Sequence, residues 1–175
     1  MNRARAAVPG LQLLSNGRYH VMVTREGTGF SRWKGLAILR WREDATRDGL
    51  GQFCYLRDAA GGGPWSATAQ PSGLQEDLVE STFSPGRAVL LRRHAGDRGG
   101  AEFDIESRTD IAIAPEDDIE LRRVSLTNRN SKRAGASRTL TVTSYCEPVL
   151  EAPGPDAAHP AFEKLFVQTE ILPQW

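Results

Sequence analysis

Aromatic and charged side chains gather in one short stretch, residues 41–48, which reads Trp-Arg-Glu-Asp-Ala-Thr-Arg-Asp. Trp33 precedes this stretch, and Tyr55 and Trp65 follow it. Proteins bind sugars by stacking aromatic rings on C–H faces and by hydrogen bonds from arginine and carboxylate groups to hydroxyls. The pattern therefore predicts a carbohydrate-binding site, whose candidate residues are Trp33, Trp41, Arg42, Glu43, Asp44, Arg47, Asp48 and Trp65.

The same residues also allow a structural interpretation. The charged residues of the stretch could pair with one another in a surface loop, and the tryptophans could fill a core. A pair of catalytic carboxylates is disfavoured, because neighbours in sequence such as Glu43 and Asp44 or Asp48 seldom face each other across a sugar. We therefore expect no catalytic residue in this chain.

Other catalytic and ligand-binding motifs are missing from the sequence. His20, His94 and His159 lie in unrelated segments without a carboxylate or cysteine at ligand spacing, so we expect no metal site. Ser31 and Ser66 are not set in the strand-turn-helix pattern of a nucleophilic serine. The glycine run at 61–63 lacks the lysine and helix of a phosphate-binding loop and predicts a hairpin tip. We therefore expect no cofactor.

Charge and cysteine content restrict the partners and the compartment. The 175 residues include 22 basic and 22 acidic side chains, so no net field attracts nucleic acid or an anionic membrane, and we expect neither partner. Cys54 and Cys146 form no paired motif and are predicted to be free, buried thiols in a reducing compartment. The N-terminus lacks an apolar segment of signal-peptide or membrane-span length, which favours a cytoplasmic chain.

The residues above must be positioned by strands, because alternation with period two recurs along the chain and helical periodicity is almost absent. The clearest strand is 101–114, where Ser107 and Thr109 share a parity with the apolar residues and the charged residues take the other. Residues 115–118 form a turn. The inward-facing apolar residues of this strand are predicted to be Phe103, Ile105, Ile111 and Ile113.

The strand after this turn, 119–128, needs a bulge at Arg122–Arg123 to keep Ile119, Leu121, Val124 and Leu126 on the core side. A third strand, 138–145, would complete a meander, and residues 151–160 form a loop. The pattern predicts one all-β domain over 1–175, an antiparallel β-sandwich of two sheets with a disordered tail at 1–10. Its other strands are predicted at 19–24, 29–33, 36–41, 52–57, 78–83, 87–93 and 164–172.

Several blocks of sequence, taken in order, carry a resemblance to a known family. They are residues 13–24, 29–33, 40–48, 53–58, 65–68, 70–71, 115–128, 158–162 and 165–170. These blocks resemble the start of the phosphorylase-like region of cyclic β-1,2-glucan synthases, which is similar to cellobiose and chitobiose phosphorylases. The resemblance implies a carbohydrate-binding β-supersandwich of the galactose mutarotase-like kind, which packs against an (α/α)6 barrel bearing the catalytic acid and the phosphate site.

The resemblance further implies a non-catalytic domain that binds or positions a β-glucan oligosaccharide and docks the barrel of a larger bacterial glycosyltransferase or glycoside phosphorylase, itself inner-membrane associated. Because the family domain is longer than 175 residues, a sandwich that lacks some of its strands remains an alternative. Two alternatives also remain: a free-standing sugar-active enzyme of mutarotase-like fold, and a structural domain for packing or homodimerisation. An apolar docking surface is expected near the C-terminus, at Phe162, Leu165, Phe166, Val167 and Trp175.

Overall fold

The computed structural model describes residues 10–42, 49–73, 78–98, 101–130 and 137–173, and strands dominate them. Of the predicted tail 1–10, only Gly10 is among these residues. The strands are β1 (Leu11–Ser15), β2 (Tyr19–Thr24), β3 (Gly29–Trp33), β4 (Leu36–Leu39), β5 (Phe53–Asp58), β6 (Trp65–Ser66), β7 (Leu78–Ser84), β8 (Arg87–Arg98), β9 (Ala101–Ile113), β10 (Glu120–Asn128), β11 (Leu140–Tyr145) and β12 (Pro148–Glu151).

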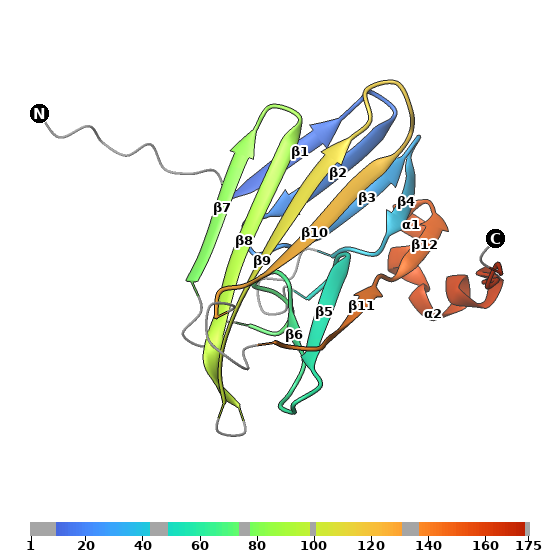
Figure 1. Ribbon diagram of the computed structural model, residues 1–175. Helices are drawn as coiled ribbons and strands as arrows, with labels where there is room; N and C mark the ends of the chain where they lie inside the picture. The colour runs from blue at the N-terminus through green and yellow to red at the C-terminus, as the bar shows by residue number, and fades with distance from the viewer. Residues whose placement is uncertain (1–9, 43–48, 74–77, 99–100, 131–136, 174–175) are drawn as a thin grey trace, which may run out of the picture.

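These strands form three antiparallel sheets, with orders β1-β2-β3-β4-β12, β10-β9-β8-β7 and β11-β5-β6. The long four-stranded sheet faces the five-stranded sheet over its upper half and the three-stranded sheet over its lower half (Figure 1). The antiparallel β-sandwich predicted from the sequence is confirmed, but the prediction of two sheets is wrong, because there are three among the described residues. The predicted meander is wrong in its third strand, because β11 pairs with β5 instead of β10 and so creates a third sheet.

Strand β9 connects two hydrophobic cores. Ile111 lies in an upper core, against the five-stranded sheet, with Leu14, Val21, Val23, Ala88 and Leu90. Phe103 and Ile105 lie in a lower core, against the three-stranded sheet, with Leu56, Trp65 and Ala67. Ile113 is half-buried against the upper core, so the predicted inward face of β9 is confirmed. Between the two cores this face carries the buried hydroxyls of Ser107 and Thr109.

Strand β10 corrects a prediction. It pairs with β9 without interruption from Glu120↔Ile113 to Asn128↔Ile105, so the predicted bulge at Arg122–Arg123 is absent. Leu121 is 58% exposed, whereas the Arg122 side chain is only 13% exposed. The reason is electrostatic. Arg122 Nε donates a hydrogen bond to the Glu120 carboxylate, and a guanidinium paired in this way can occupy an inward position. An apolar residue was expected at that position.

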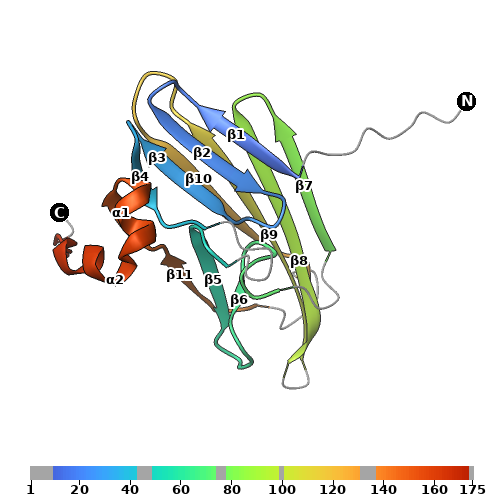
Figure 2. The same cartoon turned by 180° about the vertical axis from the view of Figure 1, so that it is seen from behind.

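The C-terminal part also differs from its prediction. Residues expected to form a loop contain α1 (Pro153–Ala158), followed by α2 (Pro160–Glu163) and the 3₁₀ helix η1 (Lys164–Phe166). Proline is tolerated in a first helical turn, where the N–H groups have no partner within the helix. Residues 167–173 form no strand, so the strand predicted at 164–172 is wrong. Figure 2 shows α1 beside β4, at the side of the five-stranded sheet where β12 is the edge strand.

The outer face of the four-stranded sheet is organised around buried carboxylates. Asp110 accepts hydrogen bonds from Arg108 Nε at 3.1 Å, from Arg87 Nε at 3.1 Å and from Arg123 Nη2 at 3.4 Å. Burial raises the pKa of Asp110, but the hydrogen bonds from Arg108 and Arg87 outweigh it and lower this pKa from 3.8 to about 2. The carboxylate therefore stays ionised well below neutral pH.

This lowered pKa predicts acid-sensitive stability. The stabilisation from ionised Asp110 is complete above pH 3.8 and is lost as the pH falls towards 2, because the folded state must then take up a proton at an unfavourable site. We expect a loss of about 1–2 kcal/mol, since water screens the half-exposed arginines. Urea unfolding at pH 5, 4, 3 and 2 measures it. In Asp110→Asn this part of the pH dependence should disappear, and an unchanged profile would contradict the assignment.

Candidate functional site

The structure separates the three candidate tryptophans. Trp65 is 3% exposed in the lower core, with its ring centroid 6.0 Å from that of Phe103 and 4.9 Å from that of His94. Trp33 lies at the end of β3, and Trp41 lies beyond β4 next to α1. The three rings therefore do not form one stacking platform, and the environment of Trp65 fits the structural interpretation.

Trp33 links two sheets. Its indole Nε1 donates to Asp118 Oδ2 at 2.6 Å, in the turn between β9 and β10, and Arg18 Nε donates to the other oxygen at 2.8 Å. The hydrogen bond from Trp33 lowers the pKa of Asp118 below its usual 3.8. Lys34 Nζ lies 4.5 Å from the centre of the Trp33 ring. These contacts give Trp33 a structural role between β3 and the turn.

Trp41 and Arg42 do come together, in a groove between β3, β4 and α1. Trp41 is half-buried, with its ring tilted by 58° against Phe30 at 5.7 Å between centroids. The guanidinium of Arg32 lies 4.5 Å from the centre of the Phe30 ring. A cavity of about 50 Å³ lies here, bordered by Trp41, Arg42, Phe30, Arg32 and Asp156; we call this set the Trp41 groove.

The Trp41 groove is anchored by a buried ion pair. Arg40 and Asp156 are 7% and 6% exposed, and Arg40 Nε and Nη2 both donate to the Asp156 carboxylate, Nε at 3.3 Å. Arg40 also donates to Glu147 Oε2 at 3.3 Å and to the carbonyl of Pro160 at 3.2 Å. The hydrogen bond with Asp156 is the main cause of a raised pKa at Arg40. This ion pair fixes α1 against the end of β4.

The C-terminal segment beyond α1 exposes apolar side chains. Glu147 holds the segment through Lys164 Nζ at 3.5 Å. The rings of Phe162 and Phe166 meet edge-on at 5.2 Å between centroids. Val167 is half-buried, and Trp175 lies outside the described residues. The exposed residues, which we call the C-terminal apolar surface, are Phe162, Leu165, Phe166, Ile171 and Leu172.

Half of the predicted site residues cannot be placed. Glu43, Asp44, Arg47 and Asp48 belong to residues 43–48, outside the described part of the chain. Arg42 is exposed, and its Nη2 donates to the Asp156 carbonyl at 3.3 Å. Contact of any of these residues with sugar stays a prediction.

Sequence reasoning missed Phe30, Arg32, Arg40 and Asp156 in the groove. A signal for two of them was present, because Phe30 and Arg32 alternate within the predicted strand 29–33 and so share one face. The pairing of Arg40 with Asp156 had no sequence signal, because the two residues are 116 positions apart.

Metal and thiol chemistry find little support in the described residues. No three histidine, cysteine, aspartate or glutamate side chains among them lie close enough to hold a metal ion. Cys54 is half-buried, and burial raises the pKa of its thiol. Cys146 is exposed, so the prediction of two buried thiols is wrong for this residue, which follows the edge strand β11. None of the helices seen in the described ranges could cross a bilayer, being too short or too polar.

Comparisons with known proteins give one family and one relative. The family model for the glycosyl hydrolase 94 supersandwich domain matches residues 1–175. The cyclic beta-(1,2)-glucan synthase NdvB of Rhizobium meliloti (strain 1021) is 38% identical to this chain over 159 residues. That match covers 91% of this chain but only 5% of the relative, so the chain spans a small part of its length.

Proposed function

The chain belongs to the glycosyl hydrolase 94 supersandwich family, and we propose that it is a non-catalytic domain of a β-glucan-processing enzyme. In this role it binds glucan at the Trp41 groove and packs its C-terminal apolar surface against the rest of the enzyme. The observation that carries the proposal is the groove itself, where two aromatic rings and two arginines meet beside an ion-paired helix.

The groove suits a neutral sugar chain. Trp41 and Phe30 offer apolar ring surface for C–H faces. Arg42 is exposed and gives one hydrogen bond, to the Asp156 carbonyl, within the described ranges, so other N–H groups of its guanidinium can donate to hydroxyls. Arg40 cannot serve in this way, because Asp156, Glu147 and the Pro160 carbonyl occupy it.

The choice of β-glucan as ligand rests on the relative, whose name describes a cyclic β-(1,2)-glucan synthase. The absence of catalysis is inferred from chemistry. Glycoside cleavage by a protein commonly needs two carboxyl groups on opposite sides of the sugar. Among the described residues that border the groove, Asp156 supplies a carboxylate, and Arg40 holds it in an ion pair.

The C-terminal apolar surface supports the packing role. Ile171 is 96% exposed, and Leu172 is exposed as well. Contact of apolar side chains with water is unfavourable, so burying these residues against a partner surface would stabilise the assembly. Because Lys164 and Arg40 both bind Glu147, this surface and the groove share one anchor. The proposed partner is the barrel domain of the parent enzyme, which would then lie next to bound glucan.

Replacing Trp41 with alanine should weaken glucan binding about tenfold, which corresponds to about 1.4 kcal/mol, because the stacking surface is lost. Calorimetric titration of the chain with linear and cyclic β-1,2-glucans measures the change. Arg42→Ala should act in the same direction, since this exposed side chain donates a single hydrogen bond to the part of the protein that the structure describes.

The matched control is Trp33→Phe, which removes the hydrogen bond to Asp118 at a site away from the groove. It should leave the glucan affinity unchanged. Equal losses in the Trp33 and Trp41 variants, or wild-type affinity in Trp41→Ala, would refute the groove as the binding site.

A further inference from the structure

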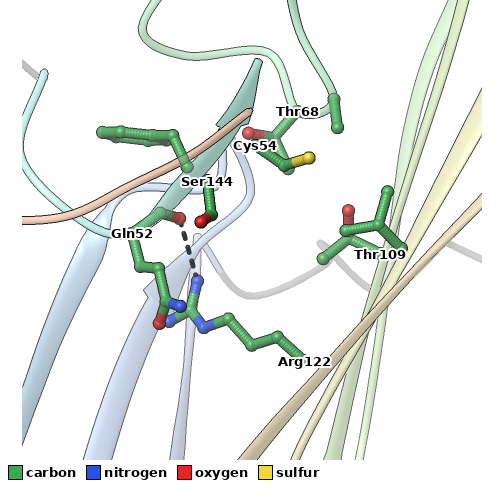
Figure 3. Close-up of a pocket in the computed structure, with 9 residues that line it drawn as sticks. Gln52, Cys54, Thr68, Thr109, Arg122 and Ser144 are labelled. Atoms are coloured by element: carbon green, nitrogen blue, oxygen red, sulfur yellow. Dashed lines mark hydrogen bonds between the residues drawn. The ribbon is translucent and has the colours of Figure 1, made fainter. Parts of the chain in front are cut away.

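A second cavity lies between the sheets, at the junction of the two hydrophobic cores (Figure 3). Its volume is about 130 Å³, and it shares no residue with the Trp41 groove. Strands β9 and β10 form one wall through Thr109, Arg122 and Val124. The opposite wall comes from β5 and β11, and includes Cys54 and Ser144. Because Ser144 is exposed, the cavity reaches the surface of the protein.

Thr109 is the feature of this cavity that points to a ligand. The residue is 5% exposed, and its hydroxyl Oγ1 has no hydrogen-bond partner among the residues that the structure describes. The neighbouring inward hydroxyl behaves differently, because Ser107 Oγ donates to the Ala67 carbonyl at 2.7 Å. A buried hydroxyl without a partner loses its bonds to water and gains none in return. Figure 3 shows Thr109 facing Cys54 across the cavity.

Arg122 supplies a second polar group. Its Nη1 donates to the Gln52 carbonyl at 3.1 Å, and its Nε donates to the Glu120 carboxylate. Glu120 is itself fixed by the hydroxyl of Ser31, which donates at 2.5 Å. The glutamate therefore neutralises the charge of Arg122, and other N–H groups of the guanidinium donate to none of the residues that the structure describes. A neutralised donor of this kind favours a neutral acceptor such as a hydroxyl over an anion.

The remaining lining combines the apolar residues Phe53 and Ala67 with the polar residues Gln52 and Thr68. We propose that this cavity binds a small neutral polyol, such as glycerol or the hydroxymethyl end of a sugar. The hydroxyl oxygens of the polyol accept hydrogen bonds from Arg122, and its hydroxyl groups donate to or accept from the Thr109 hydroxyl. The C–H groups of the polyol contact Val124 and Phe53. The size agrees, because the cavity volume is several times the roughly 10–15 Å³ that one water molecule needs on the same measure.

The test is a ¹H–¹⁵N NMR titration of the chain with glycerol and, separately, with D-glucose. We expect saturable shifts of the backbone amide signals of Cys54, Thr109 and Arg122. Thr109→Val has nearly the same shape but no hydroxyl, and should weaken binding at least tenfold. Thr109→Ser restores the hydroxyl and should restore binding.

Thermal unfolding separates this result from a folding defect. Thr109→Val should melt at the wild-type temperature or about 2–4 °C higher, because it removes a hydroxyl without a partner. The proposal is overturned by shifts that do not saturate, by equal binding in Thr109→Val, or by binding of inorganic phosphate in place of both polyols. Shifts confined to the Trp41 groove would also overturn it, and would leave the proposed glucan site intact.

Discussion

Replacing Arg40 with methionine is expected to lower the free energy of unfolding by about 3–5 kcal/mol, because removing one partner of a buried ion pair leaves the other charge buried without compensation. Asp156 is 6% exposed and accepts two hydrogen bonds from Arg40. Asp156→Asn should destabilise for the same reason, since it leaves the guanidinium without its main partner. Urea unfolding monitored by circular dichroism measures both changes.

Two further variants identify the cause. Arg40→Met combined with Asp156→Leu removes both charges and should recover much of the lost stability, because an apolar pair of similar volume avoids the desolvation penalty. Arg18→Met breaks the exposed pair with Asp118 and should cost no more than about 1 kcal/mol. Similar losses in Arg40→Met and Arg18→Met would refute the special role of the buried pair.

The same ion pair couples the fold to the proposed function. It joins the end of β4 to α1, and the Trp41 groove takes its residues from both. Loss of the pair should therefore release α1 and the C-terminal apolar surface together. Limited proteolysis of Arg40→Met should cut within 152–166 before the sandwich unfolds, and glucan affinity should fall even though Trp41 is unchanged.

Strong alternation made β9 predictable. Its inward residues Phe103, Ile105 and Ile111 are all buried, and the turn at 115–118 follows as expected. Local turn chemistry was also readable, because Gly61 and Gly62 have positive φ angles of 120° and 85° between β5 and β6. Such features depend on neighbours in sequence, which the sequence displays directly.

Features that depend on distant partners could not be predicted. Arg122 faces inward because Glu120 neutralises it, and Glu120 is fixed in turn by Ser31, 89 positions away. The same holds for Arg40, whose partner lies in a proline-containing segment that was predicted to be a loop. Burial of a charged residue can be inferred only when its partner is known, and pairing across sheets leaves no local pattern.

The candidate site likewise combines features that the sequence predicts with features that depend on the fold. Residue types indicated sugar-binding chemistry, but aromatic side chains serve cores as well as sugar sites, and only position separates these uses. Trp65 and Trp41 look alike in sequence, yet one lies in the lower core and the other borders a groove. Thr109 carried a readable signal, since a hydroxyl pair at 107 and 109 interrupts the inward apolar face of β9.

Trp65→Ala should destabilise the chain by about 3–5 kcal/mol, because it opens a large cavity in the lower core. The ring packs with Leu56, Ala67, Phe103 and Ile105, and His94 covers it at 4.9 Å between ring centroids. Trp65→Phe keeps an aromatic ring and should cost clearly less. Urea unfolding of both variants, followed by far-ultraviolet circular dichroism, measures the difference.

Glucan binding by the same variants decides between the two interpretations of this tryptophan. A core residue affects affinity only through the fraction of folded protein, so at low temperature and without urea the folded Trp65→Phe variant should bind as the wild type does. Trp41→Ala should show the opposite profile, with reduced affinity and a smaller change in stability, since its half-buried ring leaves less of a cavity. If Trp65→Phe keeps wild-type stability but loses affinity, Trp65 contacts the sugar and the groove assignment is wrong.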